Sequence, residues 1–284
     1  MTTPFRSFYK TAQGKKNEKC FYTTRLDPYG RGCKYNCSYC YGKQLLNFRK
    51  LWHPEDIAVA DMDQVEKTIK KIPRGSIVRM GGMTDCFQPI EQKYHNTYKT
   101  IELLNDHEIH YLIVTKSDLI SSKKYVELLD PTLAHIQISI ETNNDYVLRR
   151  LGDAKPFSIR KQTLETLYDA GFDVSLRLSP FLYDTADFDI INTINVKKCL
   201  VEFLRYKPNM ADQLGKFIDQ EKFTVKENGY RHLSLDQKLD IIAKLNFSEI
   251  SLCDSVKEHY LFFQQNINAN PNDCCNLDFI QKEV

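Results

Sequence analysis

Three cysteines in one short loop constrain most strongly what this chain folds into and binds. Cys33, Cys37 and Cys40 follow a C-x3-C-x2-C spacing, which brings three thiolates to one side of a tight turn. Such a trio holds three corners of a cubic iron–sulfur cluster and leaves one iron without a protein ligand. A disulfide set fits poorly because the trio is odd, and zinc fits poorly because no fourth ligand follows at finger spacing. The spacing therefore predicts a [4Fe–4S] cluster.

The composition is typical of a protein that works in a reducing compartment. The 284 residues include nine cysteines, contain no apolar run of membrane-spanning length and begin without the apolar core of a secretion signal. We therefore expect a cytoplasmic protein with no membrane partner. The net charge of +2 is too small to indicate nucleic-acid binding by itself. Residues 1–19 form a basic arm, typical either of contact with a polyanion or of a solvated tail.

Strand and helix patterns alternate from residue 20 to residue 206. We expect strands at 20–26, 76–80, 110–115, 135–140, 172–178 and 198–205, the last favoured as a strand over a helix. Apolar spacing predicts helices at 44–51, 63–72, 91–106, 117–129 and 158–170. Alternation at this rhythm produces parallel strands joined by helices. The sequence thus predicts an α/β fold, a partial (β/α)6 barrel with its chemistry at the carboxyl ends of the strands.

Residues 207–284 are expected to form a C-terminal extension of the barrel. Asn228 and Gly229 stand between two β-prone runs, which is the strongest short-range signal for a hairpin. A capping box of Ser234 and Gln237 predicts a helix, and residues 249–253 predict a last strand.

This C-terminal segment also holds a second set of cysteines, Cys253, Cys274 and Cys275. Three roles fit them: ligands of an auxiliary cluster, hydrogen donors, or buried structural thiols. Adjacent cysteines seldom bind one ion comfortably, so we rank metal binding below the structural role.

Several motifs together resemble the radical S-adenosylmethionine (SAM) superfamily and, within it, the spore photoproduct lyase group and its relatives. Residues 27–41 (DPYGRGCKYNCSYCY) match that group's cluster loop, with tyrosines on both sides of the third cysteine. Residues 81–91 (GGMTDCFQPIE) are similar to a T-D-P-Y-Q-P-x-E motif of the relatives, except that Cys86 replaces a proline and Phe87 a tyrosine. Residues 114–116 and 138–142 match the next two strand ends. The resemblance covers about residues 22–180.

The resemblance implies that the open iron chelates SAM and that reductive cleavage of SAM gives a 5′-deoxyadenosyl radical. Two glycines would let the backbone approach the methionine amino group, and a lysine would pair with the SAM carboxylate. The alternative for Lys116 and Ser139 is that they are an ordinary pair of surface residues at two strand ends and do not bind SAM. The SAM-binding residues implied in this way are Gly81, Gly82, Thr84, Asp85, Lys116 and Ser139.

Tyr39, Tyr41 and Cys86 are implied to form a hydrogen-atom relay. Thiol S–H and phenol O–H bonds are weak enough to pass hydrogen atoms to carbon radicals. Cys86, however, is displaced from the position of the hydrogen-donating cysteine in the lyase group. The alternative is that the tyrosines pack on the cluster and that Cys86 is a small buried hydrophobe.

The leading functional hypothesis is a radical SAM enzyme, of lyase or isomerase type, that acts on thymine or a modified pyrimidine in DNA. Photoproduct repair and rearrangement of a hypermodified thymidine, as in similar small enzymes of bacterial viruses, both fit. An electron donor such as flavodoxin or ferredoxin would reduce the cluster. The alternatives are a radical SAM enzyme acting on a free small molecule or a peptide, and a non-catalytic iron–sulfur module. The expected substrate contacts are Phe87 and Arg177 in the barrel and Lys222, Lys226 and Arg231 at the hairpin.

Overall fold

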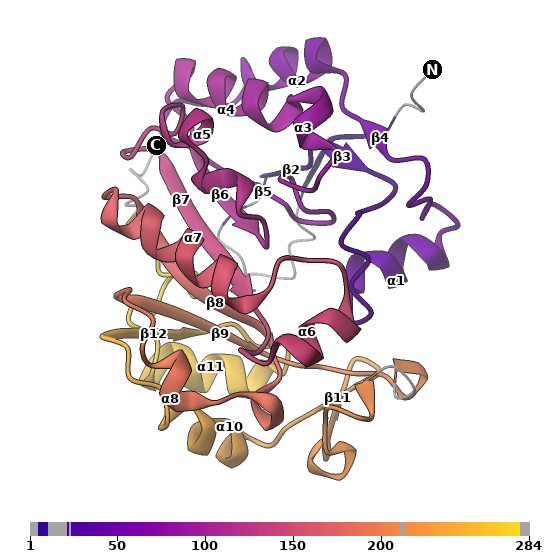
Figure 1. Cartoon of the computed structure of the whole chain (residues 1–284), viewed down its shortest axis with the longest axis vertical. Helices are drawn as coiled ribbons and strands as arrows, with labels where there is room; N and C mark the ends of the chain where they lie inside the picture. The colour runs from indigo at the N-terminus through magenta and orange to yellow at the C-terminus, as the bar shows by residue number, and fades with distance from the viewer. Residues whose placement is uncertain (1–4, 11–21, 23, 211–213, 279–284) are drawn as a thin grey trace.

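A curved, mostly parallel sheet forms the centre of the molecule. The computed structural model describes residues 5–10, 22, 24–210 and 214–278. Eight strands follow the order β1-β2-β5-β6-β7-β8-β9-β12. Within this sheet β1 (Phe8–Lys10) runs antiparallel to β2 (Thr24–Leu26), and every other neighbouring pair is parallel. Helices surround the strands in Figure 1. This is the partial α/β barrel that the sequence predicts.

The six strands predicted for residues 20–206 are all present. After β2 they are β5 (Ile77–Met80), β6 (His110–Thr115), β7 (Ala134–Ile140), β8 (Asp173–Phe181) and β9 (Lys198–Phe203). A seventh parallel strand, β12 (Glu249–Leu252), pairs with β9. The segment expected to be an extension therefore contributes a strand to the barrel sheet.

Two predicted helices differ in extent from those observed. The helix expected at 91–106 is broken into α3 (Glu91–Tyr94) and α4 (Asn96–Asp106), because His95 adopts a left-handed φ of 55°. The helix expected at 117–129 shortens to a 3₁₀ turn, Leu119–Ser121, followed by α5 (Lys123–Val126). The predictions at 63–72 and 158–170 correspond to α2 (Met62–Ile69) and α7 (Phe157–Asp169).

Helix α1 (Tyr41–Phe48) begins three residues before the predicted start at residue 44. Cys40 acts as its N-cap, because the Cys40 sulfur accepts a hydrogen bond from the backbone N–H of Lys43 at 3.4 Å. The sequence analysis did not predict the following elements: β3 (Tyr29–Gly30), β4 (Ala58–Val59), α6 (Asp145–Leu151), α8 (Phe188–Ile191) and α11 (Lys257–Asn266).

The predicted hairpin and capping box are both confirmed. Strands β10 (Val225–Glu227) and β11 (Tyr230–His232) pair antiparallel, and Asn228 and Gly229 both have positive φ angles, as a tight hairpin turn requires. Ser234 and Gln237 exchange reciprocal hydrogen bonds at the start of α10 (Leu235–Ile242).

Polar side chains fill the end of the barrel where its parallel strands begin, and the C-terminal tail closes that end. Lys198 at the start of β9 bonds to Asp173 at 2.6 Å and to Asp278 of the tail at 2.7 Å. The hydroxyl of Tyr22 donates to the Asp273 carboxylate at 2.5 Å. The tail segment 273–278 is thus tied to strands that lie far away in the sequence.

Most of the predicted basic arm, residues 1–19, lies outside the described residues, which include only residues 5–10 of it. In the described part of the chain, no helix combines the length and the apolar character needed to cross a membrane.

Candidate active site

A cavity of about 630 Å³ opens where the parallel strands end. Cys33, Cys37 and Cys40 line it together with residues from the ends of β5 to β9. In a barrel of this type the carboxyl ends of the strands carry the chemistry, so the cysteine loop and the predicted SAM contacts meet where the sequence analysis expected them.

The cysteine loop is held in shape by close backbone packing. A Cβ atom on Gly32 would lie 2.6 Å from Cα of Pro54, and one on Gly152 would lie 2.6 Å from the carbonyl oxygen of Tyr35. Neither position has room for a side chain. The loop is therefore clamped between residues 53–54 and the end of α6, and its three sulfur atoms stay on the cavity side.

The thiols of the loop lie in a poorly solvated environment. Burial raises the pKa of the Cys33 thiol, and it raises the pKa of the Cys37 thiol to about 11 although Lys116 opposes the shift. Iron ligation requires the deprotonated form, so a bound metal has to supply the positive charge that holds these thiols as thiolates.

The glycine pair after β5 makes a tight turn at the cavity wall. Gly81 has a φ of 75°, and a Cβ atom there would lie 2.5 Å from the carbonyl oxygen of Val114. The carboxylate of Asp27 accepts hydrogen bonds from the backbone N–H groups of Gly82 at 2.7 Å and Met83 at 2.9 Å. Asp27 is a supporting residue that the sequence analysis did not identify.

Asp85 ties this turn to the end of β6. Its carboxylate accepts from the Thr115 hydroxyl at 2.7 Å and from the Lys116 backbone N–H at 2.8 Å. Burial raises the pKa of the Asp85 carboxyl, although these hydrogen bonds oppose the shift. The neighbouring Thr84 hydroxyl donates to the carbonyl oxygen of Tyr29 at 2.6 Å. Both predicted residues line the cavity while also fixing the backbone around it.

A buried carboxylate at the end of β7 connects several site residues. Glu141 is 1% exposed and pairs with Lys116 Nζ at 2.5 Å and with Arg160 at 2.7 Å, and it also accepts from the Tyr39 hydroxyl. Burial disfavours its charge, but Lys116 and Arg160 outweigh this and lower the pKa of Glu141 to about 2. The sequence analysis recognised Glu141 only as part of a motif and did not predict its partner Arg160.

Two aromatic side chains of the loop also line the cavity. The Tyr41 hydroxyl donates to the carbonyl oxygen of Gly82 at 2.5 Å, while its ring is 41% exposed. The guanidinium of Arg205 stands 5.9 Å from the centre of that ring. Tyr39 and Tyr41 therefore flank Cys40 with different environments, one buried against Glu141 and the other at the mouth.

A family comparison identifies this arrangement. The family model of the radical SAM superfamily matches residues 28–195, which is more than half of the chain. The chain belongs to the radical SAM superfamily. An uncharacterised protein of Methanocaldococcus jannaschii is 29% identical to it over 170 residues, which are 56% of this chain and 61% of that relative. The chain therefore matches less than two thirds of that relative's length.

Solved structures of spore photoproduct lyase share the fold of this radical SAM protein. A double mutant of the lyase with bound AdoMet and dinucleoside spore photoproduct has a TM-score of 0.59 at 14% identity, over 88% of this chain and 78% of the lyase chain. A tyrosine-to-phenylalanine mutant of the lyase has a TM-score of 0.60 at 14% identity, and the match covers 84% of this chain and 78% of the lyase chain.

Radical SAM proteins use a [4Fe–4S] cluster and SAM, and the site fits both. The three cysteine sulfurs line one cavity, which supplies the protein ligands of such a cluster. The absence of a side chain at Gly81 makes room for the Val114 carbonyl. Gly81 and Gly82 both line the cavity, so their backbone faces a ligand bound there.

Five predicted site residues do not line the cavity: Cys86, Phe87, Lys222, Lys226 and Arg231. Cys86 and Phe87 are fully buried, and the Phe87 ring packs edge-on against Tyr125 with centroids 4.9 Å apart. Phe87 is thus a core residue and is not placed to stack on a base in the cavity. Lys226 lies on β10 of the hairpin, whereas Lys222 lies before the hairpin and pairs with Asp184 at 2.8 Å.

Arg177 is in the cavity wall, as expected for a substrate or SAM contact, but it is also paired there. Its guanidinium bonds to Glu202 at 2.6 Å and to the Gln137 side chain at 2.7 Å. Arg231 lies on β11, where its backbone pairs with that of Tyr206.

Proposed function

We propose that this radical SAM protein cleaves SAM reductively and uses the resulting radical on a pyrimidine base of DNA. When bound, the cluster and SAM together supply the 5′-deoxyadenosyl radical. The observation that carries the DNA assignment is the mouth of the cavity, where arginine, lysine and tyrosine side chains are interleaved. The chain's own residues bind, orient and shield the reactants.

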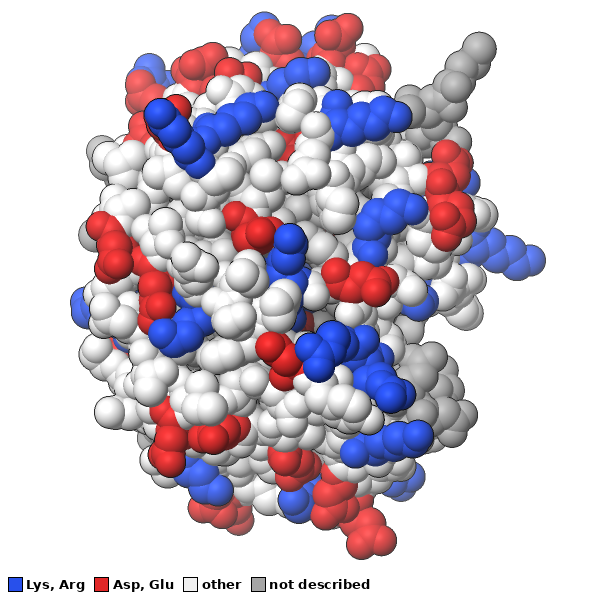
Figure 2. Space-filling model, in the orientation of Figure 1, with Lys and Arg blue, Asp and Glu red and all other residues white. Residues whose placement is uncertain are grey.

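The mouth cluster consists of Tyr41, Arg205, Lys207 and Tyr230. Arg205 stands 5.1 Å from the ring centre of Tyr230, and Lys207 stands 4.6 Å from the same ring. Figure 2 shows basic side chains gathered on the part of this face over the hairpin. Aromatic rings offer stacking surfaces to bases and the cations attract phosphates, so this combination suits a nucleotide strand that presents one base to the cavity.

The resemblance to the lyase group and the shared fold support the same class of substrate. Two of the solved lyase structures contain dinucleoside spore photoproduct. A cavity of about 630 Å³ is large enough for a small ligand and falls within the usual range for such sites.

For SAM, we propose the wall formed by Gly81, Gly82, Asp85, Lys116 and Ser139, all of which line the cavity. Lys116 is the cation at this wall, and Glu141 holds its ammonium in place at 2.5 Å. The pair leaves further ammonium N–H groups to donate to a ligand carboxylate.

We expect Lys116→Ala to weaken SAM binding about ten-fold or more, because a charge-assisted hydrogen bond contributes roughly 1.5–3 kcal/mol. Isothermal titration of the reconstituted protein with SAM measures this loss, and circular dichroism checks the fold. Lys124→Ala, which removes an exposed lysine of α5, is the control. Equal SAM affinity in the Lys116 variant and the wild type would show that Lys116 does not bind SAM.

We keep the hydrogen-atom relay in the proposal for Tyr39 and Tyr41, which line the cavity, but not for Cys86, which does not. Cys86 is fully buried, with its sulfur 3.7 Å from where a Cβ atom on Gly81 would stand. A hydrogen atom from Cys86 would therefore have to pass the glycine turn, so we assign the nearer role to Tyr41 at the mouth.

DNA binding tests the substrate assignment. We expect thymidine-rich single-stranded and duplex oligonucleotides to bind, with an affinity that falls as salt rises. Replacing Arg205 and Lys207 together by glutamine should lower the affinity roughly ten-fold and reduce the salt slope by roughly 1.5, since each phosphate contact contributes about 0.7–0.9 to that slope.

Fluorescence anisotropy at several salt concentrations measures both quantities. The matched control is the double change of Lys67 and Lys71 to glutamine, because both are exposed and lie in and just after α2, at the other end of Figure 1. The 5′-deoxyadenosine released from SAM by the reduced protein reports SAM cleavage separately. SAM cleavage without any DNA affinity at low salt would assign the enzyme to a free small molecule or a peptide.

A further inference from the structure

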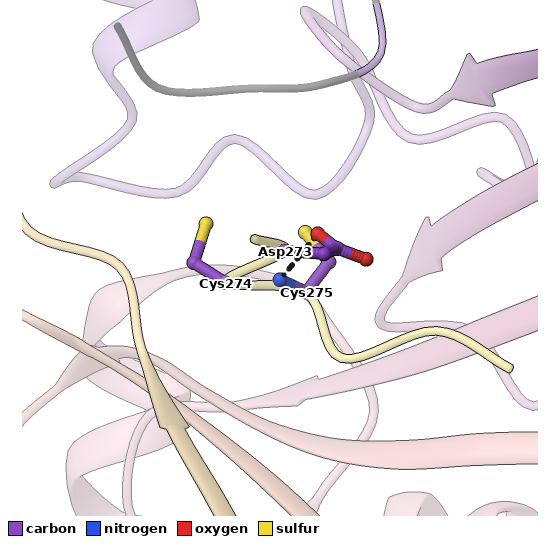
Figure 3. A group of neighbouring side chains, drawn as sticks. All are labelled: Asp273, Cys274 and Cys275. Atoms are coloured by element: carbon purple, nitrogen blue, oxygen red, sulfur yellow. Dashed lines mark hydrogen bonds between the residues drawn. The ribbon is translucent and has the colours of Figure 1, made fainter. Parts of the chain in front are cut away.

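A second group of side chains whose types can bind a metal ion lies on the C-terminal tail, outside the cysteine loop. Asp273, Cys274 and Cys275 belong to the C-terminal tail, and their ligand atoms all lie within 4.8 Å of one another. Figure 3 shows the two sulfur atoms on the same side of the tail backbone. The Cys274 thiol also neighbours that of Cys253, the residue that follows β12. Three thiols and a carboxylate therefore meet where the tail passes the end of β12.

The spacing suits one ion rather than a cluster. Metal–sulfur bonds of about 2.3 Å place the sulfur atoms of a tetrahedral site roughly 3.8 Å apart. The ligand atoms of Asp273, Cys274 and Cys275, which lie within 4.8 Å of one another, need only a small inward movement to reach that arrangement. Cys253, beside Cys274, has to move further to become the fourth ligand. A cubic cluster requires wider spacing, because each cysteine binds a different iron atom.

A backbone turn holds the Asp273 carboxylate next to the two adjacent cysteines. The N–H of Asn276 donates to the carbonyl oxygen of Asp273 at 2.9 Å, and Asn276 has a left-handed φ of 49°. The Asp273 carboxylate also accepts from the backbone N–H of Cys275 at 2.9 Å and from the Tyr22 hydroxyl at 2.5 Å. Such hydrogen bonds orient a ligating carboxylate before the ion arrives.

The surroundings also favour the charge of such a site. Three thiolates and a carboxylate around a divalent ion leave a net charge of about −2. Arg79 and Arg177 lie close enough to Cys275 to attract that charge. Cys253 lines the large cavity, so an ion can reach the site from there.

We propose that Cys253, Asp273, Cys274 and Cys275 bind a single thiophilic divalent ion of the Zn²⁺ class. All four ligands come from the protein, which is the arrangement of structural rather than catalytic zinc sites. The ion would fasten the C-terminal tail to the end of β12, independently of the iron–sulfur loop.

Zinc retention by the full chain tests this assignment. The protein is purified without oxygen, its cluster is reconstituted, and one equivalent of Zn²⁺ is added before desalting and metal analysis by mass spectrometry. We expect about one zinc per chain in the wild type and in the triple variant Cys33→Ala, Cys37→Ala, Cys40→Ala. Cys274→Ser should retain only a trace. Cys199→Ser, which changes a buried cysteine on β9, should match the wild type.

A second variant and a second measurement guard against a misfolded Cys274→Ser protein. Asp273→Asn keeps one of the two side-chain oxygens, which can still accept from Tyr22 or from Cys275 but not from both, and it should weaken zinc binding at least ten-fold. Added Zn²⁺ should raise the melting temperature of the wild type but not that of the variants, because an ion that binds only the folded state stabilises it. No retained zinc in the wild type would overturn the proposal. The proposal would also be overturned if the triple alanine variant lost its zinc while the Cys274→Ser variant retained it.

Discussion

Replacing Cys33, Cys37 or Cys40 by alanine is expected to remove the [4Fe–4S] cluster. These three thiols line the cavity together, and each would bind a different iron. Loss of one ligand exposes a second iron, so the cluster should fail to assemble or should fall apart during desalting. The iron content per chain, the visible absorbance and the EPR signal of the reduced protein measure the loss. Cys199→Ala is the control, since Cys199 is a buried cysteine on β9.

Cys40 allows the loss of the cluster to be separated from damage to the fold. Its sulfur also caps α1, so alanine removes both a ligand and a helix cap that contributes about 1 kcal/mol. Serine restores a capping oxygen but is a poor iron ligand. Cys40→Ser should therefore be as poor in iron as Cys40→Ala while unfolding at a higher denaturant concentration. A full complement of four irons in the single alanine variants would contradict the assignment of the loop.

The second large effect is expected for Glu141→Gln, which should lower the free energy of unfolding by roughly 3–5 kcal/mol. The change leaves Arg160, which is 1% exposed, and Lys116 without their shared anion. Breaking a buried ion pair on one side costs this much because an uncompensated charge remains inside the protein. Urea denaturation followed by circular dichroism measures the difference.

The pH dependence provides an independent check on Glu141. Its pKa of about 2 in the folded state is below the unfolded value of about 4.3. The stability that it contributes is therefore fully present above about pH 4.3 and is lost as the pH falls towards 2. Glu141→Gln should lack this part of the acid dependence. Glu66→Gln, which breaks a surface pair with Lys70, should leave the stability nearly unchanged, because solvent screens that pair. Equal effects of the two substitutions would show that Glu141 does not support the site.

The sequence was most informative where local patterns decide the structure. The strands at 110–115 and 135–140 have strong apolar runs, and the hairpin and the capping box follow from side chains within a few residues of each other. The cysteine spacing is equally local, and the comparison with the family model agrees with it. Each of these features can be read from a short window because its interacting residues are close in the chain.

Contacts between residues that are distant in the sequence could not be predicted from such short windows. Asp27 supports Gly82 across 55 positions, and Arg160 meets Glu141 only because α7 packs against β7. Periodicity does not state which face of the 81–91 loop points inward, so the burial of Phe87 was not predicted, and that of Cys86 was predicted only as the alternative to the relay. The break at His95 depends on one left-handed residue between two helical segments, and the residue type did not indicate it.

The closure of the barrel by the tail also sets the order in which the chain can finish folding. Tyr22 and its partner Asp273 are 251 positions apart in the sequence, and Lys198 and its partner Asp278 are 80 positions apart. During synthesis every strand of the sheet leaves the ribosome before segment 273–278 does. Contacts of such long sequence separation slow folding, because a large loop must close before they form. The nascent barrel therefore keeps an open, polar end until segment 273–278 has been translated, and only then can the contacts that close this end form.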